Sequence, residues 1–232
     1  MSPSRFFHWR RAAGLMAQRP LLFLATAGVI FTAHAIQTEV LFIPLSIARF
    51  LAIITAAAMG YALLQTPGWR GTPGIWIRFT SFVLFLYLPV LALGFVFFGA
   101  AIQAILGLWM FAVILALVAL FAAGQILLGA TLAGIVETGR IPLREGYRRA
   151  RSHARFTARA LVFGPWVVNA LVAGVKLASH QAGLPNQPFD AVTGAFLWVW
   201  LPVNALQAFG VIFAALLTVS ILHHAWAQGQ QW

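Results

Sequence analysis

Five arginines in the second half of the chain have the spacing of one helical face. They follow one another at intervals of 4, 3, 4 and 4 residues: Arg144, Arg148, Arg151, Arg155 and Arg159. An adjoining stripe of apolar or small residues accompanies them: Leu143, Tyr147, Ala150, Ala154 and Ala158. Guanidinium groups bind phosphate and carboxylate through paired hydrogen bonds. We call the five arginines the arginine stripe, and the pattern predicts a surface that binds anionic lipid or an acidic partner.

The remaining polar residues indicate no identified reaction. The chain has no cysteine, which excludes disulfides, thiolate metal sites and a catalytic thiol. A proton relay needs carboxylates within a span, but the four acids fall at the edges of apolar runs or in loops: Glu39, Glu137, Glu145 and Asp190. His34 and His180 both fall near the outer ends of runs, where histidines bond to headgroups more often than to haem. We therefore expect a protein that is not an enzyme and holds no cofactor or metal.

The composition is that of a protein that lies within a lipid bilayer. Apolar residues make up 62% of the chain and charged residues 8%, which leaves too few polar side chains for a water-soluble surface. Since a spanning helix needs about 20 apolar residues, 232 residues suffice for about six spans. We expect an all-α, polytopic helix bundle that forms a single integral membrane domain over residues 1–232. Its net charge of +11 lies beside the spans, where lipid headgroups are nearer than nucleic acid, so no nucleic-acid partner is expected.

Six apolar runs delimit the expected spans. They cover residues 20–36, 40–64, 79–101, 108–136, 160–179 and 192–222. A basic N-terminal arm, residues 1–19, precedes the first run and has the composition of an interfacial segment. Pro89 is expected to kink the third run, and the fourth is long enough to tilt or to extend beyond the bilayer. In the second run, Ala52, Ala56 and Gly60 recur every four residues and predict close packing against another helix.

The distribution of basic residues predicts the orientation of these spans. The N-terminal arm holds four, the turn-rich segment 66–78 holds two, and residues 137–159 hold seven, all on one side. Cytoplasmic loops are enriched in Lys and Arg, so both termini are expected in the cytoplasm. The spans are expected in the inner (plasma) membrane of a bacterium. This rule alone would explain the arginine stripe without any ligand, so both interpretations of the stripe stay open.

Two basic residues depart from that distribution, Arg49 and Lys176. Arg49 follows Pro44 in the second run, and two placements compete for it. If the helix effectively starts near Ser46, Arg49 snorkels outward from the beginning of the span. The alternative is a buried functional arginine within the span.

Residues 140–160 are expected to form a basic interfacial helix between the fourth and fifth runs. The Thr-Gly pair that precedes it is typical of a helix C-terminus, and Pro142 suits the first turn of a new helix. Its narrow apolar stripe would rest on the bundle or on lipid. Glu145 can pair with Arg149 one turn later, an exposed pair that contributes a few tenths of a kcal/mol.

One segment resembles part of a known family. It is Glu137-Thr138-Gly139-Arg140-Ile141-Pro142-Leu143, and a basic stretch from Gly146 to Arg159 and a span follow it. This order is similar to the stretch between two spans in a membrane domain of some glycerophosphoryl diester phosphodiesterases and of related stand-alone bacterial membrane proteins. The resemblance implies a helical membrane bundle. No segment has the length and composition of the soluble catalytic barrel of those phosphodiesterases, so their reaction is not implied.

Three functions are consistent with these features. The first is a non-enzymatic inner-membrane protein whose arginine stripe binds anionic lipid or an acidic partner. The second is a transporter or permease-like component for a lipid or another apolar compound, which requires a cavity between spans. The third is an accessory subunit of a larger membrane complex or a self-associating chain, because small-residue faces allow close helix packing. We expect the first.

Overall fold

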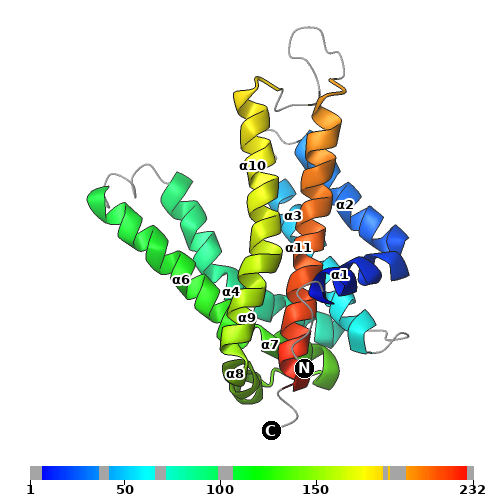
Figure 1. The fold of residues 1–232 in the computed structure, drawn as a ribbon, viewed down its shortest axis with the longest axis vertical. Helices are drawn as coiled ribbons and strands as arrows, with labels where there is room; N and C mark the ends of the chain where they lie inside the picture. Colours follow the sequence, from blue (N-terminus) through cyan, green and yellow to red (C-terminus); the bar gives the residue numbers. More distant parts are fainter. Residues whose placement is uncertain are drawn as a thin grey trace. The chain divides into compact units, whose positions relative to one another are not determined.

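A computed structural model describes residues 7–36, 42–65, 72–98, 107–184, 188 and 197–228 (Figure 1). Throughout these residues the regular secondary structure is helical, without strands. By length and composition, five helices can cross a membrane, and a sixth span results if two helices bent by 96° count as one. The chain is therefore an all-α, multi-pass membrane protein, and the prediction of this class is confirmed. The structure has five to six candidate spans where about six were predicted.

The described residues belong to two compact units. Unit 1 comprises Met1–Pro67 and Arg159–Ile221, and unit 2 comprises Gly68–Ala158 and Leu222–Trp232. Unit 1 contains the following elements: α1 (Phe7–Gln18), α2 (Pro20–Ala35), α3 (Phe42–Gln65), the end of α9 (Ala154–Leu161), the π-helical turn η2 (Val162–Trp166), α10 (Val167–Gln181) and most of α11 (Trp200–Gln228). Unit 2 contains α4 (Pro73–Phe98), the short turn η1 (Gly107–Trp109), α6 (Met110–Leu128), α7 (Ala130–Thr138), α8 (Leu143–Ser152), the start of α9 and the end of α11.

Small residues bring the helices of unit 1 together. Ala52 and Ala56 of α3 are buried, and a Cβ added at Gly60 would lie 2.8 Å from Cδ2 of Leu216 on α11. Two helices can approach this closely only where side chains are small. The predicted four-residue repeat is thus confirmed as a packing face.

The described part of the basic N-terminal arm, Phe7–Gln18, is a helix of its own. Arg19 interrupts the helical conformation, Pro20 begins α2, and α1 and α2 are bent by 96° at this break. Proline at the first helical position has no amide proton to satisfy and a fixed φ, so it favours a new start. The buried side of α1 carries His8, Ala12 and Leu15, and His8 Nδ1 lies 2.9 Å from Ser220 Oγ of α11.

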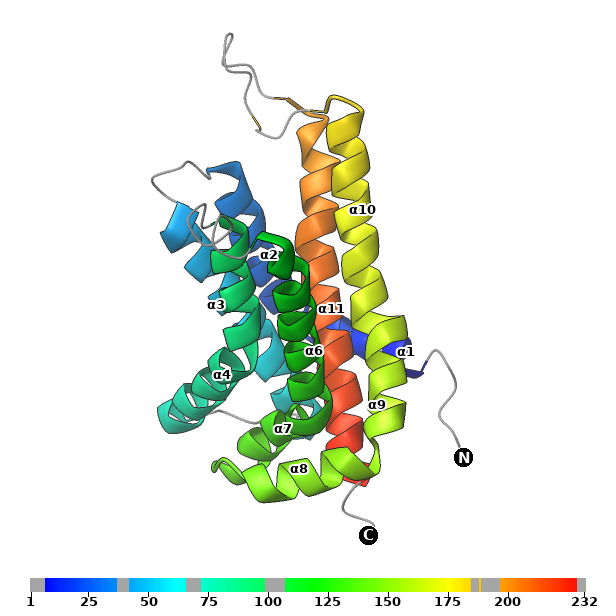
Figure 2. The same cartoon turned by 90° about the vertical axis from the view of Figure 1, so that its left-hand side faces the viewer.

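In unit 2, α7 forms the core. All of residues 130–136 are buried, and α4, α6 and α8 pack around this short helix. Figure 2 shows α8 running beside α7. By contrast, the side chains of α6 are almost all apolar and only Gln125 among them is buried, as expected of a helix that faces lipid.

Several predicted boundaries were wrong. The fourth run is two helices, α6 and α7, which meet at Gly129, where an added Cβ would lie 2.7 Å from Cδ1 of Leu222. The third helix begins at Pro73, inside the predicted loop, because the carbonyl of Thr72 already accepts the N–H of Ile75 at 3.0 Å. The sixth helix continues to Gln228. The predicted end of the third run at residue 101 and the predicted start of the sixth at residue 192 lie outside the described residues.

The helix of the second run begins before Ser46, the start that the snorkelling hypothesis assumes, and the helix of the fifth run begins before residue 160. Helix α3 starts at Phe42, with Pro44 in its first turn, where a missing amide proton costs nothing. Arg49 is half-buried and donates through Nη2 to Ser46 Oγ at 3.2 Å, so its side chain points back toward the start of α3. This direction is the one that the snorkelling hypothesis expects. The fifth candidate span is continuous from Ala154 to Gln181.

Gly146 provides the first test of this packing. A Cβ added there would overlap Oγ1 of Thr131 on α7 and lie 3.0 Å from its Cα. Gly146→Ala should therefore destabilise the protein by about 1–3 kcal/mol and lower its melting temperature in detergent by several degrees. Gly74→Ala in α4 is the matched control, because nothing lies within 4 Å of its added Cβ. Equal melting temperatures of the two variants would contradict the close approach of α7 and α8.

Candidate functional site

Helix α8 carries three of the five stripe arginines and is bounded by turns whose signals were visible in the sequence. Gly139 caps α7 with φ 69°, a left-handed conformation that glycine adopts without steric cost. Its carbonyl accepts a hydrogen bond from Arg78 of α4. Pro142 then precedes α8, and its carbonyl accepts the N–H of Gly146 at 2.8 Å. The predicted stop at Thr138-Gly139 and the new helix after Pro142 are confirmed.

Arg149, which lies outside the arginine stripe, anchors α8 within unit 2. Its side chain is buried, and the guanidinium carbon lies 3.9 Å from the ring centroid of Trp226, near the end of α11. Nη1 donates to the carbonyl of Trp226 at 3.2 Å, and Nη2 pairs with Glu145 one turn earlier. The indole Nε1 of Trp226 in turn donates to Glu137 of α7. A cation, an aromatic ring and two carboxylates thus join α7, α8 and the end of α11, and we call these four residues the Arg149 anchor.

Two glycines make room for this anchor. A Cβ added at Gly134 would overlap the indole of Trp226 and lie 2.6 Å from Cγ of Pro142. At Gly146 the backbone of α8 lies directly against Thr131 of α7. Trp226 is only 2% exposed because α7, the turn and α8 enclose it.

The arginine stripe lies on the surface. All five of its members are exposed. Within the described part of the chain, none of them makes a hydrogen bond or an ion pair with the protein. The only acids in this part are Glu137 and Glu145, and the Arg149 anchor already uses both. The stripe guanidinium groups therefore keep their donors available for a ligand.

The predicted apolar side of α8 was partly wrong. Ala150 is buried as expected, but Leu143 is 49% exposed and Tyr147 is 42% exposed. The buried side consists of Gly146, Arg149 and Ala150, because α8 turns its smallest side toward α7. On the helical wheel, Leu143 and Tyr147 lie between this buried side and the arginines. The free surface of α8 is therefore amphipathic.

The expected continuous helix over residues 140–160 is two helices. The Ser152 hydroxyl donates to the carbonyl of Arg149 at 2.7 Å, and the N–H of His153 turns to the carbonyl of Ala150 at 3.1 Å. A side chain that bonds to the backbone in this way competes with the regular helical ladder. The chain turns at His153, and α9 begins at Ala154 (Figure 2).

This break divides the arginine stripe. The structure brings Arg144, Arg148 and Arg151 together on one side of α8. Arg155 follows in the first turn of α9, and Arg159 belongs to unit 1. The site within unit 2 therefore consists of the first four arginines together with Leu143 and Tyr147.

Sequence reasoning missed the anchor itself. The pair of Glu145 and Arg149 was expected as an exposed contact, whereas Arg149 is buried against Trp226. One signal was present, because Arg149 shares a side of the helical wheel with Gly146 and Ala150 instead of with the other arginines. Nothing local could have identified Trp226, which is 77 residues away.

Comparisons of the chain with protein-family models, with curated proteins and with solved structures find no match. The candidate site therefore depends on its geometry and charge.

The anchor can be tested with two neighbouring arginines. Arg149→Gln removes the cation from Trp226 and leaves Glu145 without its partner, so we expect a loss of about 3 kcal/mol in stability. Arg148→Gln, on the exposed side, should change stability by less than about 0.5 kcal/mol. Thermal unfolding in detergent measures both, and hydrogen exchange reports whether the amides of α8 lose protection in Arg149→Gln alone. Similar behaviour of the two variants would show that Arg149 does not anchor α8.

Proposed function

We propose that this chain is a non-enzymatic protein of the bacterial inner membrane whose arginine stripe binds anionic phospholipid headgroups. One observation carries the proposal. The stripe guanidinium groups are exposed and have no carboxylate partner within the described residues, because Arg149 and Trp226 engage the acids nearest to them. Each basic residue near an anionic membrane surface contributes about 1 kcal/mol to binding. Planar guanidinium groups also match phosphate oxygens in pairs.

The exposed apolar residues of α8 favour lipid over an acidic protein as the ligand. Leu143 and Tyr147 lie beside the arginines on the same free surface. In a bilayer interface such residues enter the boundary of the acyl region, while long basic side chains extend to the phosphates. A soluble acidic partner that binds the arginines alone would leave Leu143 and Tyr147 exposed to water.

The orientation follows from the same distribution of charge. We infer that α8 and both termini lie on the cytoplasmic side, because the loops on that side hold all but two of the basic residues. The resemblance of residues 137–159 to the membrane domain of some glycerophosphoryl diester phosphodiesterases is compatible with this role and stays a hypothesis. The transporter and accessory-subunit hypotheses also stay untested.

Neutralising part of the stripe should weaken lipid binding. In Arg148→Gln/Arg151→Gln/Arg155→Gln, three contributions of about 1 kcal/mol are lost, so affinity for phosphatidylglycerol or cardiolipin should fall roughly a hundredfold. Native mass spectrometry of the full chain, gently extracted from its membrane, reports the bound lipids. The control with the same loss of charge is Arg10→Gln/Arg19→Gln/Arg140→Gln, which should retain far more lipid.

Either of two outcomes would refute the lipid proposal. One is equal lipid retention by the stripe variant and the wild type, with preserved folding. The other is an equal loss in both triple variants, which would show that net charge acts without a defined surface. A foreign subunit at fixed stoichiometry would instead favour an accessory role.

Single cysteines can test the orientation, because the natural chain has none. Trp109→Cys in η1 and Arg151→Cys in α8 both replace exposed side chains. In intact cells, a membrane-impermeant maleimide should label Cys at position 109 and leave position 151 unlabelled until the inner membrane is opened. The reverse pattern would contradict the proposed orientation.

A further inference from the structure

Three arginines of the stripe form a row along the free surface of α8. Arg144, Arg148 and Arg151 follow one another at intervals of four and three residues within this one helix, so the Cβ atoms of neighbours lie roughly 5–6 Å apart. From Arg144 to Arg151 the row extends over about 10 Å at 1.5 Å per residue. We call these three residues the α8 row.

The α8 row carries more positive charge than one phosphodiester can compensate. All three arginines are exposed, and none has an acidic partner within the described residues. Each guanidinium group keeps its single positive charge, whereas a phosphodiester has one negative charge. Because a planar guanidinium group can bind two phosphate oxygens at once, one or two arginines suffice for one phosphate. Three arginines in a row therefore leave room for a second phosphate.

Two phosphates in one lipid suit this row better than two separate lipids. When the first phosphate is bound, a short covalent bridge holds the second beside the next arginine, so that the second contact becomes intramolecular. The loss of translational and rotational freedom on binding is then incurred once instead of twice. A glycerol bridge is short enough to keep both phosphates over neighbouring arginines of the α8 row.

An apolar row lies beside the arginines and favours a lipid over a soluble bisphosphate. Leu143 and Tyr147 are exposed and one helical turn apart. Tyr147 lies three residues from Arg144 and four from Arg151, which makes it a neighbour of both on the helix surface. Acyl chains that leave the two phosphates can cover these apolar side chains, which a soluble bisphosphate would leave in water.

We propose that the α8 row selects diphosphatidylglycerol (cardiolipin), a lipid with two phosphodiesters joined by glycerol, over lipids with a single phosphate. Arg144 binds one phosphate and Arg151 the other, with Arg148 between them. This inference rests on the proposed lipid-binding function of the arginine stripe and names the headgroup that the stripe prefers.

Removing one end of the row should abolish the preference without abolishing lipid binding. Cardiolipin and phosphatidylglycerol compete for the full-length protein in detergent micelles at equal phosphate concentration, and native mass spectrometry counts each lipid that stays bound. The wild type should prefer cardiolipin roughly tenfold or more. In Arg144→Gln this preference should disappear, while retention of phosphatidylglycerol falls less than about threefold, because Arg148 and Arg151 still bind one phosphate. Arg151→Gln, at the other end of the row, should behave like Arg144→Gln.

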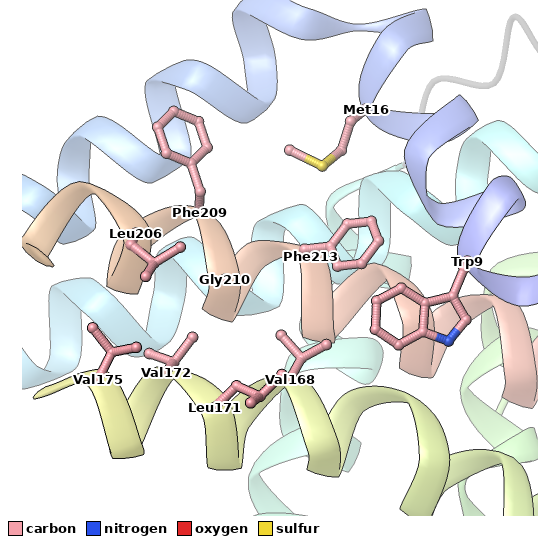
Figure 3. A pocket seen from close by; sticks show the side chains of 10 residues that line it. All are labelled: Trp9, Met16, Val168, Leu171, Val172, Val175, Leu206, Phe209, Gly210 and Phe213. Atoms are coloured by element: carbon pink, nitrogen blue, oxygen red, sulfur yellow. The ribbon is translucent and has the colours of Figure 1, made fainter. Parts of the chain in front are cut away.

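Two control variants lie outside the row. Arg140→Gln removes the same charge at an exposed position before α8 and should keep the preference for cardiolipin. Figure 3 shows an apolar groove of unit 1 between α1, α10 and α11, and its lining residues include no charged side chain. Leu171→Trp changes the exposed edge of this groove and should also keep the preference, because the groove lining offers no cation to a second phosphate.

The outcomes separate this inference from the proposed function. Equal retention of the two lipids by the wild type overturns the selectivity and leaves the proposed lipid binding intact, whereas retention of neither lipid refutes both. An equal loss of preference in Arg144→Gln and Arg140→Gln assigns the preference to net charge and overturns the role of the row. Displacement of cardiolipin by an equimolar glycerol bisphosphate, which has no acyl chains, overturns lipid as the ligand.

Discussion

A buried guanidinium must find partners for its charge inside the protein, and in unit 2 this requirement fixes the position of α8. Arg149 meets it with the ring and carbonyl of Trp226 and with Glu145. Because Trp226 belongs to the end of α11, α8 is joined to a helix 77 residues away in the chain. Gly134 and Gly146 leave room for this contact. Arg144, Arg148 and Arg151 lie on the opposite side of α8, so the anchor directs them out of the unit.

The chain has many more basic than acidic residues, so the outward-facing arginines of α8 lack acidic partners among the described residues. The chain has fifteen basic residues and four acids, and the anchor consumes both of the acids that the structure describes. The positive charge of the stripe must therefore be compensated from outside the described residues. Beside the ends of membrane spans, the phosphate groups of lipid headgroups are the most abundant anions. The exposed Leu143 and Tyr147 complete a surface suited to the bilayer interface.

Local signals made much of the fold predictable. The apolar runs indicated the all-α membrane class, and the Thr-Gly pair with Pro142 placed the turn before α8. The breaks at Gly129 and His153 were both missed, and the second involves a hydrogen bond from the Ser152 hydroxyl to the backbone that the residue pattern did not indicate. The exposed arginines could be predicted from their spacing. The buried side of α8 could not be predicted in the same way. A helical wheel separates polar from apolar side chains, whereas the space available beside α7 decides which side of α8 is buried.

The depth of α8 at the membrane tests this account most directly. A nitroxide on Tyr147→Cys, in an otherwise cysteine-free chain, can be measured by power saturation in vesicles that contain phosphatidylglycerol. The account predicts that the label relaxes more strongly with oxygen, which concentrates in lipid, than with a water-soluble nickel complex, and that a label at Arg148→Cys lies nearer to water. Equal and full access of the nickel complex to both labels would place α8 in water and contradict a lipid-binding surface.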